Sequence, residues 1–348
     1  MRIIGLGAVS SLGHDVSSLA DLQRLEAPEP DRPFQLTQLN ETPFYQGGIE
    51  DNLAVSSFEL ALRACRDALH DSGLRSKNIA LLLATGAGDT EALERGDCDH
   101  NTPYELAERI ASELSLEGVY ATVSNACSSA SYALALADDL FDEGHDAVLL
   151  CGVEGKSVTT QATFKSLLVL DQTSCRPFEE DRNGTVLGCG AAALILSNTK
   201  SDESAECYAR VCSVSTSCDA YHATSPEPSG AQMQRCIDEV LCRAGIKSQQ
   251  VTLFVPHATG TILNDEIEQQ LLKETFPDTF SKESTLLVKK YLGHTGGGSA
   301  AFSLLVAALT LRCSEFDSDC SKHDYALINS TAFGGNNSCT LLEAVNGA

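Results

Sequence analysis

Apolar segments of strand length alternate with longer amphipathic segments in this sequence, and the alternation runs through the chain twice. Such an alternation is typical of α/β proteins, in which helices cover buried sheets. We expect strands over 2–10, 78–86, 146–154 and 191–198, and again over 207–217, 251–260, 286–290, 325–331 and 339–345. We expect helices over 55–73, 127–140 and 233–244, from 265 onwards, and after 294.

The polar stretch 197–206 separates the two runs, so we predict an N-terminal half over residues 1–199 and a C-terminal half over residues 200–348. The 348 residues suffice for two domains of about 150 residues each, with a core that needs no disulfide or structural metal. The stretch from Glu26 to Asp51 is rich in Pro, Gln, Asp and Gly and lacks periodicity. We expect an irregular cap or crossing loop there rather than a further domain.

The formal net charge of −24 argues against a nucleic-acid partner, because the phosphate backbone would be repelled over most of the surface. No apolar run approaches the roughly 18 residues of a membrane span. Glycines, His14 and Asp15 interrupt the apolar start of the chain where a signal peptide would continue. We therefore expect a cytoplasmic protein without a membrane segment.

The 14 cysteines are scattered through apolar stretches and form no C-x-x-C pair. Zinc sites need clustered ligands at short spacings, so we expect reduced core cysteines and no bound metal. The glycines of GLGAVSSLG do not form a dinucleotide motif, because Ser10 stands where a glycine is needed. The sequence thus predicts neither a metal nor a nicotinamide cofactor.

Cys127 lies in the segment VSNACSSASYALALADDL, where small residues precede an apolar helix. Its sulfur is therefore expected near a helix N-terminus, where the helix dipole favours a thiolate. Backbone N–H groups that are unpaired at such a terminus can also stabilise an oxyanion. A buried structural cysteine would fit this segment, taken alone, equally well.

His257 follows the apolar run LFVP, and His294 follows LLVKKYLG. Both are expected where a strand passes into a turn or a helix, which is where α/β folds place functional groups. A single histidine in either place would more often be structural. Two histidines in matching contexts favour a shared site.

Five blocks of the sequence resemble signature blocks of the β-ketoacyl-acyl-carrier-protein synthase family, in the order of that family. They are SNACSSA, CRPFEEDRNGTVLGCGAAAL, DAYHATSPEP, HATGTILNDEIE, and KKYLGHTGGGSAA together with NSTAFGGNNS. The resemblance spans nearly the whole chain. It implies a thiolase-like fold, in which two related α/β halves form αβαβα layers, and a dimer formed through a strand of the first half.

By this resemblance, Cys127 is the nucleophile that receives the acyl chain. His257 and His294 bind the thioester carbonyl of the extender unit and help to decarboxylate it, and Lys289 matches the lysine of the family's K-x-x-x-G-H pattern. Hydrogen-bond donors aimed at the carbonyl oxygen lower the barrier because negative charge develops there. The backbone N–H groups of Cys127 and Phe333 would hold the later tetrahedral oxyanion.

The resemblance also assigns supporting residues. Glu268 matches the acidic residue that follows the first histidine motif, and Asp265 is a further supporting position. Thr259 and Thr261 match threonines that contact the phosphopantetheine arm, which arrives on the carrier protein, so no resident cofactor is implied. The simpler alternative for Glu268 and Lys289 is a solvated surface charge.

By the same resemblance, a histidine at position 294 favours the elongating class, which has a Cys-His-His triad. The initiating class has an Asn at this position, and thiolases have a cysteine-bearing motif in place of the second histidine. Chain-length factors, the inactive partners of ketosynthases, typically lack the nucleophile that this chain keeps as Cys127. The chain is shorter than a typical elongating synthase. The missing length falls before Leu53 and between Gly88 and Thr122.

Four positions depart from the motifs of the family. Ala258 stands for the glycine of H-G-T, Thr185 for the phenylalanine of D-G-F-V, Cys189 for the glutamate of G-E-G, and Ala332 for the first glycine of G-F-G-G. These departures favour a specialised pathway over a housekeeping role.

The resemblance implies a β-ketoacyl synthase that condenses acyl-Cys127 with malonyl-ACP in fatty-acid or type II polyketide-like biosynthesis. Its partners would be acyl-ACP, malonyl-ACP and a second ketosynthase subunit in a homodimer or heterodimer. A local basic patch, with Lys156, Lys165 or Arg176 as candidates, would be needed to attract an acidic carrier protein. Two alternatives stay open: an acyltransferase that uses the acyl-cysteine, and a noncatalytic partner subunit that resembles a chain-length factor.

Overall fold

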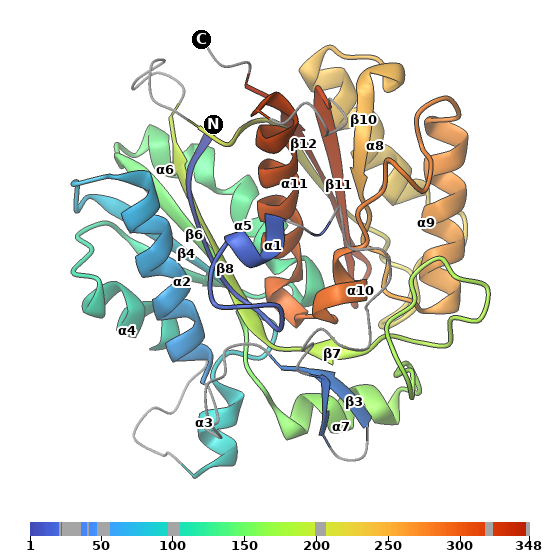
Figure 1. The fold of residues 1–348 in the computed structure, drawn as a ribbon, viewed down its shortest axis with the longest axis horizontal. Coiled ribbons are helices and arrows are strands. Elements are labelled where there is room, and N and C mark those ends of the chain that lie inside the picture. Colours follow the sequence, from blue (N-terminus) through green and yellow to red (C-terminus); the bar gives the residue numbers. More distant parts are fainter. Residues whose placement is uncertain are drawn as a thin grey trace.

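The described part of the chain forms a nine-stranded sheet, a three-stranded sheet and helices that pack on them (Figure 1). In the large sheet the strands run in the order β10 (Val251–Val255), β11 (Tyr325–Ala332), β12 (Asn336–Glu343), β9 (Ala209–Cys218), β1 (Arg2–Val9), β8 (Gly190–Ser197), β6 (Ala147–Glu154), β4 (Ile79–Ala84) and β5 (Tyr120–Val123). The computed structural model describes residues 1–20, 22, 36–39, 42–46, 56–96, 105–198, 207–316 and 323–345.

The large sheet consists of two related halves that meet at β1 and β9. These two strands share only the pairs Arg2 with Arg210 and Ile3 with Ala209. Outward from this join, the order β1-β8-β6-β4 in the first half matches the order β9-β12-β11-β10 in the second. The predicted pair of related halves is therefore confirmed, whereas the boundary between residues 199 and 200 lies outside the described residues and stays a prediction.

The helices complete an αβαβα arrangement. Helix α11 (Ser299–Phe316) is buried on all sides from Ser299 to Leu311 and lies with α5 (Ser129–Ala135) between the halves (Figure 1). Its apolar residues share one core with Leu6 of the first half and Ile328 of the second. The outer layers are α2 (Ser57–Ser72) and α4 (Glu105–Glu113) on the first half, and α8 (Ala231–Ala244) and α9 (Ile262–Thr275) on the second. The predicted fold class is confirmed.

Helix α2 shows how local sequence sets these layers. Ser56 and Glu59 form a reciprocal capping box at its start, and Gly73, with φ of 63°, ends it in the left-handed conformation. A Cβ atom at Gly7 would lie 2.0 Å from the carbonyl oxygen of Ala64 on α2. Gly7 in the motif GLGAVSSLG therefore permits close packing of helix on strand.

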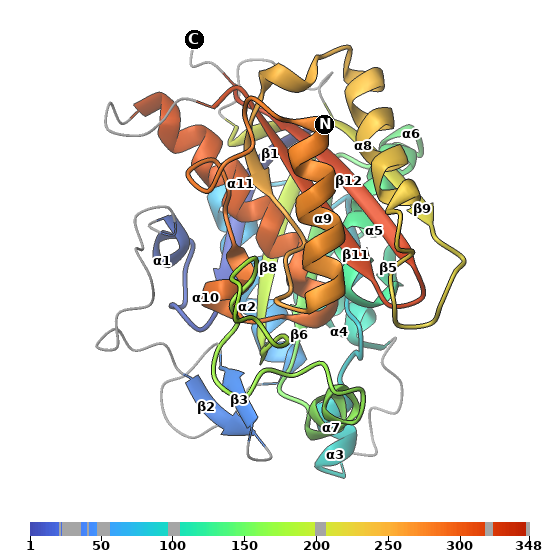
Figure 2. The same ribbon diagram turned by 90° about the vertical axis from the view of Figure 1, so that its right-hand side faces the viewer.

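The three-stranded sheet consists of β2 (Leu36–Leu39), β3 (Thr42–Tyr45) and β7 (Leu187–Gly188). Figure 2 shows β2 and β3 at the lower end of the molecule, where α3 (Thr90–Glu94) and α7 (Val158–Ser166) also lie. The expectation that the stretch 26–51 lacks regular structure is therefore wrong for β2 and β3. The remainder of that stretch, apart from Gln46, lies outside the described residues.

The expected strand over 286–290 is wrong. Leu286 donates its N–H to the carbonyl of Phe254 at 2.8 Å, but the chain then turns into helix α10 (Val288–Leu292). The helix buries Val288 and Leu292, four positions apart, as a helical face requires. Lys289 is buried beside them, so His294 follows a short helix and not a strand.

The expected helix over 127–140 is interrupted near Leu136, where α5 passes into α6 (Ala137–Asp142). The remaining short elements are α1 (Ser17–Ala20) and the 3₁₀ turns η1 (Ala126–Ser128), η2 (Ser248–Gln250) and η3 (Gly296–Gly298). The described cysteines are all free, and most are buried. No helix in the described ranges has the length and apolar character needed to cross a membrane.

Candidate active site

Cys127 lies on η1, directly before α5. The preceding Ala126 has φ of 48°, a left-handed conformation that is costly for a residue with a side chain. Ser129 stabilises this turn: its Oγ accepts the N–H of Asn125 at 2.8 Å and donates to the carbonyl of Ala126 at 2.6 Å. The turn holds the nearly buried Cys127 at a fixed place in the wall of a cavity.

His294 lies in hydrogen-bonding distance of this cysteine. Its Nε2 atom is 3.0 Å from Cys127 Sγ, and its Nδ1 atom is 2.8 Å from Ser299 Oγ at the start of α11. The backbone is held as well, because the N–H of His294 donates to the carbonyl of Val186 at 2.7 Å. The imidazole is thus oriented from both ring nitrogens, as a general base requires.

His257 follows β10 and is held by a lysine and a glutamate. Lys289 Nζ donates to the carbonyl of His257 at 2.6 Å and lies 3.4 Å from its Nδ1. Glu268 accepts the N–H groups of His257 and Ala258, each at 2.7 Å. Lys289 and Glu268 are both buried, so neither is the solvated surface charge that was the simpler alternative.

The pKa values of the site follow from burial. Burial raises the pKa of Cys127 to about 12, and the nearby charge of Lys289 opposes this only in part. Burial lowers the pKa of both His257 and His294 well below the ordinary value, and Lys289 lowers both further. These shifts favour a thiol and a neutral imidazole in the resting site, because desolvation opposes the thiolate that the helix terminus favours.

Asp265 stabilises the loop that carries the two threonines. Its carboxylate accepts the N–H of Thr259 at 3.0 Å, the N–H of Gly260 at 3.1 Å and the N–H of Phe178 at 2.9 Å. Thr259 Oγ1 lies 2.8 Å from Thr261 Oγ1, and both residues line the cavity. Asp265 therefore shapes the wall from behind rather than facing the cavity.

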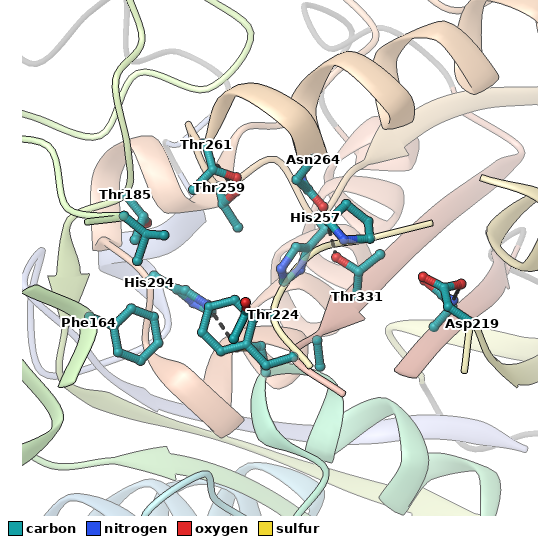
Figure 3. Close-up of a pocket in the computed structure, with 16 residues that line it drawn as sticks. Phe164, Thr185, Asp219, Thr224, His257, Thr259, Thr261, Asn264, His294 and Thr331 are labelled. Carbon is teal, nitrogen blue, oxygen red and sulfur yellow. Dashed lines mark hydrogen bonds between the residues drawn. The ribbon is translucent and has the colours of Figure 1, made fainter. Parts of the chain in front are cut away.

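The cavity encloses about 570 Å³, open solvent at its mouth included. The backbone N–H of Phe333 hydrogen-bonds to the sulfur of Cys127, and the ring of Phe333 stacks on Phe164 with centroids 5.6 Å apart. The rings of His257 and His294 are 5.6 Å apart and nearly perpendicular (Figure 3). The lining residues are Cys127, Phe164, Val169, Thr185, Asp219, Thr224, Pro226, His257, Thr259, Thr261, Asn264, His294, Thr331, Ala332, Phe333 and Asn337.

The structure brings together Cys127, His257, His294 and Lys289, as predicted, with Phe333, Thr259 and Thr261 in or beside the cavity. Sequence reasoning missed Ser299 and Phe164. Ser299 is one of many serines, and only the geometry shows that it contacts His294. Phe164 lies on α7, a helix for which the sequence carries no strong signal.

Among the four departures from the family motifs, Thr185 and Ala332 line the cavity, Ala258 follows His257 with φ of 38°, and Cys189 is buried away from the lining. Within the described ranges, no three His, Cys, Asp or Glu side chains are grouped so that they could hold a metal ion. The arrangement, a thiol with an imidazole base, a second imidazole and two backbone N–H groups, is suited to acyl transfer through a cysteine thioester.

Comparison with known proteins agrees with this chemistry. The models "Beta-ketoacyl synthase, N-terminal domain" and "Beta-ketoacyl synthase, C-terminal domain" match residues 45–202 and 208–317. A 3-oxoacyl-[acyl-carrier-protein] synthase 2 of Staphylococcus aureus is 24% identical over 402 aligned residues, which cover 96% of this chain and 98% of the relative.

Solved structures share the fold. The ishigamide ketosynthase/chain length factor has a TM-score of 0.81 at 24% identity, and covers 99% of both chains. A type II polyketide synthase acyl carrier protein in complex with its ketosynthase gives a TM-score of 0.80 at 21% identity, also over 99% of both chains. The fold and the thiol site define a condensing enzyme of thiolase-like architecture. More narrowly, the chain belongs to the β-ketoacyl synthase family.

Proposed function

We propose that this protein is a β-ketoacyl synthase that joins an acyl chain on Cys127 to a malonyl unit carried by an acyl carrier protein, with loss of carbon dioxide. The observation that carries the proposal is the distance of 3.0 Å between His294 Nε2 and Cys127 Sγ, with the ring of His257 facing the same cavity. Fatty-acid or type II polyketide-like biosynthesis is the setting that its relatives suggest.

The first step is acyl transfer to Cys127. The thiol gives its proton to His294 Nε2 while the sulfur attacks the thioester carbonyl of the acyl carrier. The N–H groups of Cys127 and Phe333 stabilise the oxyanion of the tetrahedral intermediate. When this intermediate collapses, the carrier thiolate leaves and takes up a proton, and the acyl group stays on the sulfur.

The second step is decarboxylation. The carbonyl oxygen of the malonyl thioester accepts hydrogen bonds from the Nε2 atoms of His257 and His294. The bond between the carboxylate carbon and the α-carbon breaks, carbon dioxide leaves, and its electron pair forms an enolate that both imidazoles stabilise. The α-carbon then attacks the acyl carbonyl, the thiolate of Cys127 leaves, and a proton from solvent restores the thiol.

Ser299 allows His294 to serve both steps. As a base towards Cys127, His294 accepts at Nε2 and donates its Nδ1 proton to Ser299 Oγ at 2.8 Å. As a donor to the enolate, it carries its proton on Nε2, and Nδ1 accepts the Ser299 hydroxyl. A hydroxyl can donate or accept, so the same contact supports both tautomers.

His257 needs only the donor tautomer, which Lys289 favours. A protonated Lys289 Nζ directed at Nδ1 leaves the imidazole proton on Nε2, towards the cavity. Burial lowers the pKa of Lys289, and the nearby carboxyl of Glu268 opposes this shift by favouring the protonated amine. The scheme uses no metal or redox cofactor.

We further propose an acyl carrier protein and a second ketosynthase subunit as partners, and a cytoplasmic location. Arg176, one of the expected basic residues, bonds to Asp171 at 2.8 Å and to Asp181. Lys156 donates to Gln46 at 2.8 Å. Carboxylates therefore neutralise Arg176, which makes it a weaker candidate for carrier docking.

The experiment that tests the proposal follows the acyl carrier and the malonyl carrier by mass spectrometry, with His257→Ala as a comparison. We expect the 3-oxoacyl product with the wild type, and retained acylation with strongly reduced decarboxylation in His257→Ala. Acylation of the wild type without decarboxylation would instead favour the acyltransferase. Absence of acylation, alone or with a partner ketosynthase, would favour the noncatalytic subunit.

A further inference from the structure

Thr185 occupies a central place in the cavity wall, between the backbone of His294 and the loop that carries Thr259. The residue after it, Val186, accepts the N–H of His294 at 2.7 Å, and the residue before it, Gly184, donates its N–H to the carbonyl of Gly260 at 3.0 Å. Figure 3 shows the Thr185 side chain beside His294, on the same side as Thr259 and Thr261. Thr185 thus adjoins the groups that receive the malonyl thioester in the proposed reaction.

The backbone of Thr185 is held in register by a second segment. Its N–H donates to the carbonyl of Val169, and its carbonyl accepts the N–H of Asp171, each at 2.8 Å. The direction of the side chain is therefore set by the fold. Behind it lies Cys175, whose buried sulfur is 4.0 Å from Thr185 Oγ1.

The side chain at position 185 sets how far the wall reaches into the cavity. The family motif D-G-F-V resembled by NGTV carries a phenylalanine at this position, and threonine is far smaller. Because Cys175 lies behind Thr185, the difference in size falls on the cavity side, in the wall that Val169 also lines. Thr185, Val169 and Phe164 all line this cavity, and such a mixture of small and apolar side chains suits a small apolar group.

We propose that this space receives an alkyl group on the α-carbon of the extender, so that the enzyme accepts 2-alkylmalonyl thioesters as well as malonyl thioesters. The inference rests on the proposed function. The α-carbon is bonded directly to the carbonyl carbon whose oxygen faces His257 and His294, so a substituent on it lies within reach of the residues beside His294. The acyl chain, by contrast, begins at the sulfur of Cys127.

The substituent takes no part in the bonds that change. The bond between the carboxylate carbon and the α-carbon breaks and carbon dioxide leaves. The α-carbon then forms the new bond to the acyl carbonyl, the bond from that carbonyl to the Cys127 sulfur breaks, and the thiolate takes up a proton. The product is a 2-alkyl-3-oxoacyl thioester. Thr185 is thus a specificity-determining residue and not a catalytic one.

The test compares malonyl and 2-methylmalonyl thioesters of one carrier protein as extenders, with the wild type, Thr185→Phe and Thr185→Val. When a larger side chain at position 185 fills the wall, the single methyl group of the 2-methylmalonyl extender should change its rate relative to malonyl by about tenfold or more. We expect kcat/KM of the wild type for the two extenders to agree within about tenfold. Thr185→Phe should lower the ratio of methylmalonyl to malonyl kcat/KM by about tenfold or more, whereas Thr185→Val, of similar volume, should keep it.

Thr185→Leu, a smaller insertion, replaces Thr185→Phe if that variant does not fold, and should lower the ratio in the same direction. A wild type that condenses malonyl but rejects 2-methylmalonyl would overturn the inference and leave the proposed function intact. An unchanged ratio in Thr185→Phe, or a change in acyl-chain preference alone, would also overturn it. Failure with both extenders would count against the proposed function itself.

Discussion

The Nε2 atom of His294 lies 3.0 Å from the sulfur of Cys127, although 167 positions separate the two residues in the sequence. Cys127 precedes α5 in the first half, and His294 precedes α11 in the second. These two helices pack together between the halves, so the contact forms only when the whole αβαβα arrangement is assembled. The candidate active site is therefore a property of the complete fold.

The raised pKa of Cys127 predicts how the thiol reacts with an alkylating reagent. Only the thiolate reacts, and a pKa of about 12 keeps its fraction small at neutral pH. We expect the rate of iodoacetamide modification at Cys127 to rise by about tenfold per pH unit and to keep rising at pH 10. The modification rate of an unstructured cysteine peptide, whose thiol has a pKa of about 8.5, levels off below pH 10. Peptide mass spectrometry measures both, and a plateau for Cys127 below pH 8 would contradict the assignment.

Ser299→Ala removes the hydroxyl that supports both tautomers of His294. An unsatisfied buried partner costs about 1–3 kcal/mol, so we expect the condensation rate to fall by about tenfold or more. Ser299→Thr keeps the hydroxyl and should retain most activity. Ser303→Ala, on the next turn of α11, is the matched control for packing. If Ser299→Ala stays within twofold of the wild type while Tm is unchanged, the tautomer role is wrong.

Ala258→Gly relieves backbone strain beside His257. Ala258 has φ of 38°, a region that costs an L-residue with a side chain about 1–2 kcal/mol. Glycine recovers part of that, so we expect the free energy of unfolding in urea to rise by about 0.5–1 kcal/mol. Ala162→Gly, in the middle of exposed helix α7, should instead lower it by about 1 kcal/mol. Equal losses in both variants would show that Ala258 is not strained.

The exposed edge of the large sheet at β5 leads us to expect that the protein forms a dimer. Strand β5 is the last strand of the large sheet, and its side chains are largely exposed: Tyr120 is 49% exposed and the preceding Val119 is 48% exposed. Such an apolar edge invites pairing with a second chain. We expect light scattering to give a dimer for the wild type and a monomer for Tyr120→Lys. Tyr221→Lys, at an exposed aromatic residue between β9 and α8, should remain dimeric, and a monomeric wild type would refute the interface.

Much of the fold could be predicted because apolar periodicity is strong where strands and helices are long. The order of the halves and the strands that precede His257 follow from such periodicity. The prediction for 286–290 is wrong because a short apolar run fits a strand and a helix alike. The bonds from the N–H of Lys290 to the carbonyl of Leu287, and from the N–H of Gly293 to the carbonyl of Lys289, make this segment a helix.

Some features of the candidate active site could be predicted from the sequence, and others could not. Cys127, His257, His294 and Lys289 stand in recognisable motifs, so their proximity could be predicted from the resemblance. The protonation state of Cys127 could not, because a helix terminus is visible in a sequence whereas the depth of burial is not. The contact of Ser299 with His294 likewise depends on the angle at which α11 begins after η3.

Intact-mass spectrometry after incubation with a panel of acyl carrier proteins shows whether Cys127 carries the acyl chain. Cys127→Ala is the test variant, and Cys242→Ala, at an exposed cysteine of α8, is the matched control. We predict an acyl adduct on the wild type and on Cys242→Ala, and none on Cys127→Ala. An adduct that persists in Cys127→Ala, or is absent from the wild type with every donor, would show that Cys127 is not the acylated nucleophile.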